Sequence, residues 1–544
     1  MRSHGQHTVV VGAGIGGLTA ALDLADRGLR VSVFDRNAAP GGKIRTMPSA
    51  AGPVDAGPTV FTLRPIFEEL FSDIGARISD HLTLTSASVI ARHHWRDGGW
   101  LDLYADPEAS AEAIRAFSGP ADADAFRSFN DRTAMLFEAL DLPMMRAPAP
   151  GPLSVTRALG PNLFRVTRAS KPLKSMWREL TGTFRDPRLR QLFARYATYV
   201  GGSPFLSPAL LTLIWQAEAR GVHLVSGGMR ALARGLERLA KERGVLFHYG
   251  ADVREILVAD SHVRGVTLRT GEAFLADTVV FNGDPAALAA GRLGQAAQGA
   301  VRQRSRNDRS LSAYVWTFAS PAAGVRLAHH NVFFGDDYEA EFHDLFAIRR
   351  VPRDPTIYLC AQDRNSVGEG PDGPERFQII MNAPADGDVV VPSEQEIRTC
   401  ETRTFERLEA AGLRLTRPGA EALTTPWDFE RLFPATGGAL YGANPHGLMA
   451  SFKRPKARTP IAGLYLAGGG THPGPGVPMA ALSGRHAAAA IVSDRALTST
   501  SRRGDMLGGM SMDSVMTDAV ASRSSVLSAL SFLRIISGRG ARRP

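Results

Sequence analysis

A glycine-rich segment near the start of the chain carries the clearest chemical pattern in this 544-residue sequence. The segment, Gly12 to Gly17, follows a β-branched run and opens a predicted helix. Gly12 permits a tight turn, Gly14 lets a pyrophosphate approach the backbone, and Gly17 lets the helix pack closely on the strand. Asp35 ends the next predicted strand, 30–34, where a carboxylate can accept hydrogen bonds from both hydroxyls of a ribose. This spacing predicts a dinucleotide site, with the phosphates at the unpaired N–H groups of the helix N-terminus.

A second match to the same glycine spacing, at 368–373, serves as an internal comparison. Glu, Pro and Asp interrupt its glycines, and the residues that follow, 376–381, are typical of a strand and not of a helix. We interpret this second segment as a surface turn, so the sequence predicts one dinucleotide site.

The residues after the acid at position 35 indicate which dinucleotide is bound. A second glycine turn that carries a cation, PGGK at 40–43, is followed by VDAGPTVF at 54–61. This order resembles the superfamily of flavin-containing amine oxidases and phytoene desaturases, in which a Gly-Gly-Arg/Lys motif follows the ribose-binding acid. The resemblance implies FAD as the cofactor, with the lysine beside the phosphates. It implies contacts at Gly41, Gly42, Lys43, Gly57 and Pro58.

Two later segments complete the expected cofactor site by the same resemblance. Near the C-terminal end, a predicted strand at 464–467 leads into three glycines and then a helix from about Ala480. The glycines let the backbone pass close to the flavin, and N–H groups at the helix start stabilise negative charge on its ring. In the middle of the chain, a predicted helix and strands belong to the same domain. The resemblance implies further contacts at Val253, Gly468, Gly469, Val477, Pro478 and Met479.

These separated segments predict an α/β fold, in which a Rossmann-like FAD-binding domain of the amine-oxidase and phytoene-desaturase type carries an inserted α+β substrate domain. We expect residues 1–90, 221–300 and 445–497 to form the FAD-binding domain. Residues 91–220 and 301–444 are expected to form a domain that binds substrate and associates with membrane. The tail, 498–544, is rich in Ser and Arg, and we expect it to be largely disordered.

Residues 151–190 concentrate the positive charge of the chain. They hold nine basic and two acidic residues, a net charge of +7 out of the whole-chain +9, with large apolar side chains interleaved. Such a mixture is typical of a contact with an anionic lipid surface, and a solvated basic face is the alternative. A nucleic-acid partner is not expected, because no nucleic-acid-binding motif accompanies the charge.

The two insertions differ in their predicted secondary structure. The first is mostly helical in pattern, and we predict a buried helix from Pro208, with Ser207 as N-cap, to Gly221. The second contains strand-like runs, as expected of a sheet with one face on an apolar cavity. These runs are 312–319, 331–335, 356–361 and 376–385.

Histidines and cysteines give little indication of a metal site or of disulfide bonds. The histidine pairs at 93–94 and 329–330 have no third ligand at metal-binding spacing, so no metal is expected. The two cysteines, Cys360 and Cys400, favour a reducing cytoplasm over a disulfide framework. The uncharged stretch 196–217 contains two glycines and two prolines, so we predict no transmembrane segment. We therefore expect a cytoplasmic protein that associates peripherally with the inner membrane.

Five segments together resemble bacterial carotenoid desaturases of the phytoene-desaturase family, over about residues 8–495. They are VDAGPTVFT (54–62), YVGGSPFLSPAL (199–210), HHNVFFGDDYEAEF (329–342), YLCAQDR (358–364) and AGGGTHPGPGVPMAALSGR (467–485). The last segment and NAPADGD (382–388) are most similar to the branch that desaturates 1-hydroxycarotenoids between C3 and C4. One departure is Asp35, where many relatives have Glu; either carboxylate reaches a ribose.

The resemblance implies FAD-dependent desaturation of an acyclic C40 carotenoid. A hydride would leave an allylic carbon for the flavin and a proton would leave the neighbouring carbon, while the polyene spreads the developing positive charge. Catalysis would then depend on positioning, and we assign no catalytic acid or base. With one dinucleotide site predicted, a quinone or oxygen is the expected electron acceptor.

Three alternatives stay open. A phytoene desaturase and a carotene isomerase share the fold, and the isomerase would use FAD without net oxidation. The fold also occurs in non-catalytic prenyl-binding escort proteins. The intact glycine motifs near both ends of the chain argue against the escort alternative.

Overall fold

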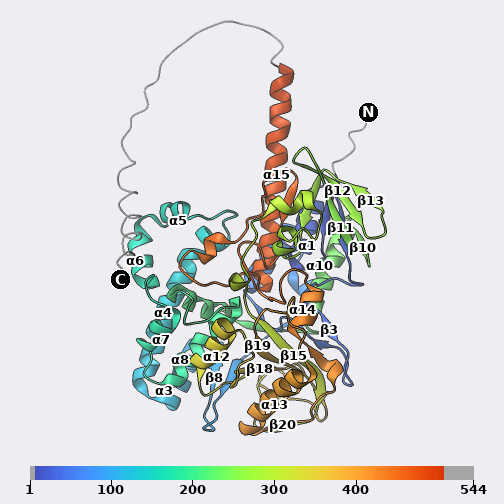
Figure 1. The fold of residues 1–544 in the computed structure, drawn as a ribbon. Coiled ribbons are helices and arrows are strands. Elements are labelled where there is room, and N and C mark those ends of the chain that lie inside the picture. Colours follow the sequence, from blue (N-terminus) through green and yellow to red (C-terminus); the bar gives the residue numbers. More distant parts are fainter. Residues whose placement is uncertain (1–6, 508–544) are drawn as a thin grey trace, which may run out of the picture. The chain divides into compact units, whose positions relative to one another are not determined.

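The computed structural model describes residues 7–507 of the chain (Figure 1). The chain divides into two units, residues 1–492 and 493–544. Every element below belongs to the first unit, except that helix α15 (Val477–Leu507) continues from the first unit into the second. Within residues 7–507, no helix is both long and apolar enough to cross a lipid bilayer.

A five-stranded sheet joins segments from the start, the middle and the end of the chain, and all its neighbouring strands are parallel. This arrangement agrees with the prediction that distant stretches meet in one Rossmann-like sheet. The strand order is β10 (Leu246–Tyr249), β2 (Arg30–Asp35), β1 (His7–Val11), β14 (Thr278–Phe281) and β22 (Leu464–Leu466).

Both faces of this sheet are covered, which explains the continuous apolar runs in its strands. Helices α1 (Ile15–Asp26), α10 (Arg230–Glu242) and the first turns of α15 pack together on one face. A three-stranded antiparallel sheet packs on the other face and shares a core with Val9 and Phe34. Its strands are β11 (Val253–Ala259), β12 (His262–Leu268) and β13 (Ala273–Leu275).

A seven-stranded mixed sheet forms the second large element of the fold. One face packs on helix α13 (Glu394–Ala410). The predicted strands of the second insertion are confirmed, and two strands of the first insertion extend their sheet. The strand order is β21 (Leu423–Thr424), β15 (Ser312–Ser320), β19 (Glu375–Ala383), β18 (Ile357–Ala361), β17 (His330–Phe333), β7 (Val89–His94) and β8 (Trp100–Tyr104).

The rest of the first insertion is helical, as the sequence predicted. Buried residues of α4, α5 and α6 share one small apolar cluster with Phe452 packed against it. The helices are α3 (Pro107–Ser118), α4 (Pro120–Leu140), α5 (Pro152–Leu159), α6 (Leu163–Ser170), α7 (Met176–Thr181) and α8 (Pro187–Ala194).

The prediction of a single α-helix from Pro208 to Gly221 is wrong. A 3₁₀ segment, η5 (Ala209–Ile214), precedes a short α-helix, α9 (Trp215–Ala219). The hydroxyl of Thr212 donates a hydrogen bond to the carbonyl oxygen of Ala209 three residues earlier, which fits the tighter 3₁₀ turn. The predicted end is correct, because Gly221 follows with a positive φ of 112°.

Shorter elements complete the fold. Strand pairs β3–β4, β5–β9 and β6–β9 are antiparallel, and helix α2 packs into the same apolar core as α1 and α10. The bounds of these and of the other short elements are β3 (Thr46–Met47), β4 (Val54–Asp55), β5 (Phe61–Thr62), α2 (Arg64–Asp73), β6 (Leu84–Ser86), η2 (Asp141–Met145), η4 (Arg195–Val200), β9 (Val222–Val225), α11 (Pro285–Ala289), β16 (Ala322–Gly324), α12 (Tyr338–His343), β20 (Leu413–Leu415) and α14 (Pro426–Leu432).

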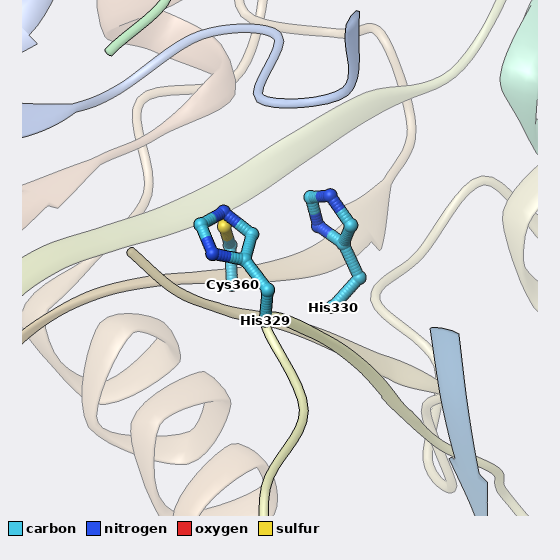
Figure 2. A group of neighbouring side chains, drawn as sticks. All are labelled: His329, His330 and Cys360. Carbon is cyan, nitrogen blue, oxygen red and sulfur yellow. The ribbon is translucent and has the colours of Figure 1, made fainter. Parts of the chain in front are cut away.

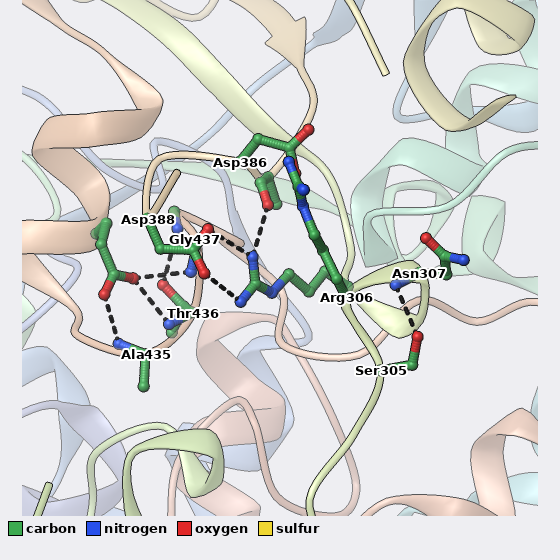
Figure 3. A network of polar contacts seen from close by, with 12 residues as sticks. Ser305, Arg306, Asn307, Asp386, Asp388, Ala435, Thr436 and Gly437 are labelled. Atoms are coloured by element: carbon green, nitrogen blue, oxygen red, sulfur yellow. Dashed lines mark hydrogen bonds and ion pairs between the residues drawn. The ribbon is translucent and has the colours of Figure 1, made fainter. Parts of the chain in front are cut away.

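A polar network fixes the loops beyond strand β19 (Figure 3). Arg306 Nε lies 2.6 Å from Asp386 Oδ1, and Arg349 also pairs with this buried carboxylate. Asp388 accepts two hydrogen bonds, of 2.8 and 2.7 Å, from the guanidinium of Arg309. Glu430 accepts backbone N–H groups of the turn 435–437 at 2.8 to 2.9 Å. The N–H of Gly387 donates to the carbonyl oxygen of Gly437 at 2.8 Å, which ties the turn after α14 to the loop beyond β19. That turn leads into a wall of the cavity described below.

Helix α15 differs from the prediction at both ends. It begins at Val477 and not at about Ala480, because Pro478 fits the first helical turn, where a backbone N–H is not needed. It continues to Leu507, beyond residue 497, since no proline interrupts the segment 480–507. The rest of the predicted tail, 508–544, lies outside the described residues.

We predict that Gly17→Ala weakens the packing of α1. A Cβ atom at Gly17 would lie 2.1 Å from the carbonyl oxygen of Gly12, a backbone atom with little freedom to move. Overpacking of this kind costs about 1–3 kcal/mol, so the melting temperature and the content of bound cofactor should both fall. The control is Gly299→Ala, because Gly299 is exposed and its added methyl meets nothing within 4 Å. Equal melting temperatures for the two variants would contradict this role of Gly17.

Candidate cofactor and substrate site

A cavity of about 830 Å³ lies where the strands β1, β2, β14 and β22 end and the seven-stranded sheet begins. Ligands of open parallel sheets bind at the carboxyl ends of the strands. Of the fifteen residues that the sequence predicted as cofactor contacts, fourteen line this cavity; Gly17 does not, since it packs against the turn at Gly12. That these residues contact a cofactor stays a prediction.

The glycines at the start of α1 let other backbone segments approach closely at the edge of the cavity. Gly12 has a φ of 103°, as the predicted tight turn requires. A Cβ at Gly14 would lie 2.8 Å from Asn282 Nδ2, and one at Gly16 would lie 2.7 Å from the nitrogen of Gly468. The helix begins at N-cap Gly14 without a capping side chain, so its first N–H groups face the cavity unoccupied by protein oxygens. These features fit a bound pyrophosphate.

Asp35 stands at the end of β2 with its carboxylate on the cavity wall. The side chain is 7% exposed, and Oδ2 accepts the N–H of Ala13 at 2.7 Å. Oδ1 accepts the N–H of Asn37, also at 2.7 Å. Val253, the predicted neighbour of an adenine, lines the same part of the cavity with Ala251. Fixed in this way, the carboxylate fits the role of accepting hydrogen bonds from a ribose.

Lys43 is partly buried, and its ammonium group reaches the wall of the cavity formed by Phe433 and Leu440. Nζ donates a hydrogen bond to the carbonyl oxygen of Leu440 at 2.5 Å and lies 5.2 Å from the centre of the Phe433 ring. Burial lowers the pKa of Lys43, and the charge of Asp284 partly offsets this effect. At Gly57, in the segment 54–61, a Cβ would lie 1.9 Å from the carbonyl oxygen of Lys43. This segment therefore packs tightly against the second glycine turn, 40–43.

Sequence reasoning missed three polar residues of this cofactor side: Asn282, Asp284 and Arg454. The side-chain amide of Asn282 donates to the carbonyl oxygen of Gly12 at 3.1 Å. Burial lowers the pKa of Arg454 to about 10, with Asp284 as the opposing charge. The turn after strand 278–281 could have indicated the first two, whereas no local pattern marks Arg454.

The C-terminal segment returns to the cavity as the sequence predicted. Gly468 follows β22 with a φ of 103°, and Gly469 continues the wall. Val477, Pro478 and Met479 form the start of α15 and line the cavity. The earlier start of the helix brings its N-terminus to the wall itself, where the helix dipole favours negative charge.

Beyond the cofactor side, the same cavity continues between the seven-stranded sheet and the helical insertion. A cross-strand row of Val315, Ile380, Tyr358 and Val332 supplies the sheet wall. The facing wall is apolar: Leu63, Phe137, Met145, Leu213, Ala217 and Met479. A third part is polar and mostly buried: Arg195, Tyr199, Tyr338, Glu341, Thr356 and Asn382.

Neutral polar groups lie next to the cofactor side. The hydroxyl of Tyr358 is 2.8 Å from Thr59 Oγ1 and 2.8 Å from His330 Nδ1. Burial raises the pKa of Tyr358 well above its usual value and lowers the pKa of His330 well below. Both side chains are therefore uncharged near neutral pH, and neither offers a strong base.

The structure brings Cys360 to the histidine pair at 329–330, a neighbour that the sequence spacing did not reveal (Figure 2). One ligand atom from each residue lies within 4.8 Å of the others. Burial raises the pKa of the Cys360 thiol to about 12, so it stays protonated. Among the described residues no carboxylate joins the group, and the small cavity beside it is lined by Arg230, Arg234 and Arg376. These cations disfavour a bound metal ion.

The second glycine motif, 368–373, forms an exposed loop before β19 and no helix follows it, as expected. Within residues 7–507, the parallel sheet with its glycine-lined cavity and the mixed sheet over an apolar cavity define a flavoprotein oxidoreductase fold. Residues 15–492 match the family described as flavin containing amine oxidoreductase, and the chain belongs to this family. Its cofactor is accordingly FAD.

Individual relatives agree with this membership. The chain is 51% identical to a hydroxyneurosporene desaturase of Cereibacter sphaeroides over 91% of this chain and 99% of the relative. It is 48% identical to a hydroxyneurosporene desaturase of Rubrivivax gelatinosus over 96% of this chain and 99% of the relative.

The crystal structure of an oxidoreductase from Methanosarcina mazei superposes with a TM-score of 0.53 at 17% identity, over 88% of this chain and 99% of that one. A putrescine oxidase triple mutant gives a TM-score of 0.53 at 15% identity, over 90% and 99%. These structures support the fold alone.

Glu341 gives the cavity a pH-dependent effect on stability. Burial raises the pKa of Glu341 from 4.5 to about 7, although the hydrogen bond from Thr356 opposes the rise. Between these values the folded protein holds a proton that the unfolded chain has released, so the free energy of unfolding falls as pH rises from about 5 to 8.

We predict that Glu341→Gln removes this fall. The difference in unfolding free energy, wild type minus variant, should decrease by up to about 3 kcal/mol between pH 5 and pH 8. Denaturant unfolding of the FAD-loaded protein at the two pH values measures it. Glu339→Gln, exposed on the same helix α12, is the control. A difference that stays constant with pH would contradict the buried state of Glu341.

Proposed function

We propose that the protein is an FAD-dependent desaturase of an acyclic C40 carotenoid and that it introduces the C3–C4 double bond of a 1-hydroxycarotenoid. The observation that carries the proposal is that one cavity contains both the glycine-lined cofactor side and an apolar side. The two hydroxyneurosporene desaturases that cover nearly the whole chain support the choice of substrate.

The walls of the cavity would position the substrate beside the flavin and exclude water. The bound flavin would accept a hydride from the substrate, and a proton would leave the neighbouring carbon. The apolar wall and the row Val315, Ile380 and Val332 would hold an extended hydrocarbon chain and exclude water. The groups nearest the cofactor side, Thr59, Tyr358 and His330, are neutral, so positioning and not a strong base would supply the rate.

We predict that the purified protein is yellow and converts hydroxyneurosporene in liposomes, with a quinone or oxygen as acceptor. The product should lose two hydrogens and absorb at longer wavelength, because one more double bond joins the conjugated system. Phytoene, assayed in parallel, should react far more slowly. Faster conversion of phytoene, an isomer of unchanged mass, or a colourless protein that takes up no FAD would each contradict the proposal.

A membrane contact at helices α5 and α6 fits a substrate that does not dissolve in water (Figure 1). Leu153, Phe164 and Leu173 are 74%, 77% and 93% exposed. Exposed basic residues lie between them along the chain: Arg157, Arg165 and Arg168. We call these six side chains the α5–α6 surface. Basic and large apolar side chains together suit an anionic lipid surface, here the cytoplasmic side of the inner membrane.

One turn links this part of the fold to the cavity. The π-helical turn η2 (Asp141–Met145) leaves Leu142 72% exposed and places Met145 on the cavity wall. Phe137, one turn earlier on α4, lines the cavity as well. A carotenoid entering from the lipid would therefore meet apolar side chains from the surface inward.

We predict that the double variant Phe164→Asp, Leu173→Asp binds liposomes of anionic lipid about 10-fold or more weakly, because each buried side chain of this size contributes about 1.5–3 kcal/mol. Flotation with liposomes measures the bound fraction. The control is Leu275→Asp, since Leu275 is 74% exposed on β13 of the cofactor side. Equal flotation of the double variant and the control would contradict a contact through the α5–α6 surface.

A further inference from the structure

Two ionisable side chains that line the polar part of the cavity have buried atoms without a hydrogen-bond partner. Nε and Nη2 of Arg195 and Oε1 of Glu341 are buried and have no hydrogen-bond partner among the described residues. Both residues line the cavity, and they are 6% and 2% exposed. Leaving a buried donor unpaired costs free energy, and at a side chain that lines a cavity a ligand can supply the partner.

Arg195 is held in a fixed orientation. Nη1 donates to the hydroxyl of Tyr199 at 3.0 Å, and the guanidinium lies 4.9 and 5.1 Å from the ring centres of Tyr196 and Tyr199. Nη2 is 3.6 Å from Glu218 Oε2, which is beyond hydrogen-bond distance. These contacts hold the guanidinium in place, while Nε and Nη2 have no hydrogen-bond partner among the described residues.

Glu218 balances the charge of Arg195 but does not satisfy these donors. The hydroxyl of Tyr196 donates to Glu218 Oε2 at 2.6 Å, and the hydroxyl of Tyr199 donates to Oε1. With a buried carboxylate already beside it, the guanidinium does not require an anionic ligand. A guanidinium also cannot accept a hydrogen bond. The missing partner is therefore a neutral oxygen on a ligand that is otherwise apolar.

The position of Arg195 relates this oxygen to the reacting bond. Tyr199, which accepts a hydrogen bond from Arg195, lines the cavity together with Tyr358 and packs against the same apolar cluster. Tyr358 in turn shares a hydrogen bond with Thr59, next to the predicted flavin contact Pro58. In a 1-hydroxycarotenoid a single methylene separates the oxygen-bearing carbon from the C3–C4 bond. An oxygen bound at this polar part would thus bring C3 and C4 close to the cofactor side, while the rest of the chain occupies the apolar part.

We propose that Arg195 donates hydrogen bonds to the oxygen at C1 of the substrate and so selects hydroxylated over non-hydroxylated carotenoids. The inference rests on the proposed function and deepens it. Because Arg195 is a donor, a methyl ether oxygen at C1 is accepted as well as a hydroxyl.

The test compares kcat and KM for hydroxyneurosporene, methoxyneurosporene and neurosporene in the same liposomes. The hydrogen bond to a charged donor is expected to give the wild type a preference of about 10- to 100-fold for either oxygenated substrate. In Arg195→Met this preference should vanish through slower turnover of both oxygenated substrates. Arg195→Lys, which keeps the charge, should retain part of it. Flavin absorbance of each variant reports folding.

The control is Arg132→Met, because Arg132 also pairs with a buried glutamate, Glu179, at 3.2 Å and does not line the cavity. It should leave the preference unchanged. If Arg195→Met does not retain its flavin, the result for Arg195→Lys is used instead. An undiminished preference of Arg195→Lys for the oxygenated substrates would overturn the inference. An undiminished preference in a flavin-loaded Arg195→Met overturns it too, as does a wild type that oxidises neurosporene equally well. If the wild type oxidises none of the three substrates, the proposed function itself fails.

Discussion

The close approach of glycine backbones at the edge of the parallel sheet is the constraint on which the rest of the structure depends. Gly14 and Gly16 meet Asn282 and Gly468 at distances that leave no room for a side chain. Through these contacts the segments at the start, middle and end of the chain meet at one place. The long insertions can then vary in structure, because the cofactor side is fixed by backbone and not by their side chains.

Local signals in the sequence were enough for the cofactor side of the fold. The run before Gly12, the helix to Asp26 and the acid at position 35 each follow from spacing that the structure reproduces. The strands of the second insertion were also predictable, since their β-branched and aromatic residues extend over whole strands. The family resemblance located Gly468 and Met479, for which spacing alone would not have sufficed.

What could not be predicted depends on contacts between distant segments. Whether residues 209–219 form an α-helix or a 3₁₀ segment depends partly on the packing of Trp215, whose Nε1 donates to Asn130 at 3.0 Å. Arg454 and Arg195 occur in no motif that the sequence shows, and their burial becomes evident only when the insertions fold over the sheet. Cys360 joins the histidine pair because strands β17 and β18 are neighbours, with His330 opposite Cys360.

The separation of charges along the cavity bears on how a desaturase could choose one bond. Lys43, Asp284 and Arg454 lie on the cofactor side, and Arg195 with Glu341 lies on the polar part, with apolar walls beside them. A polyisoprenoid repeats the same pattern of carbons and methyl groups along its length, so an apolar channel alone would bind it in several registers of similar energy. A fixed donor at one place in the cavity removes this degeneracy, because other registers would leave both the donor and the substrate oxygen unpaired. Under the proposal made for Arg195, the choice of bond therefore comes from the place where the substrate oxygen is held, and the neutral groups beside the cofactor need only hold the chosen bond in position.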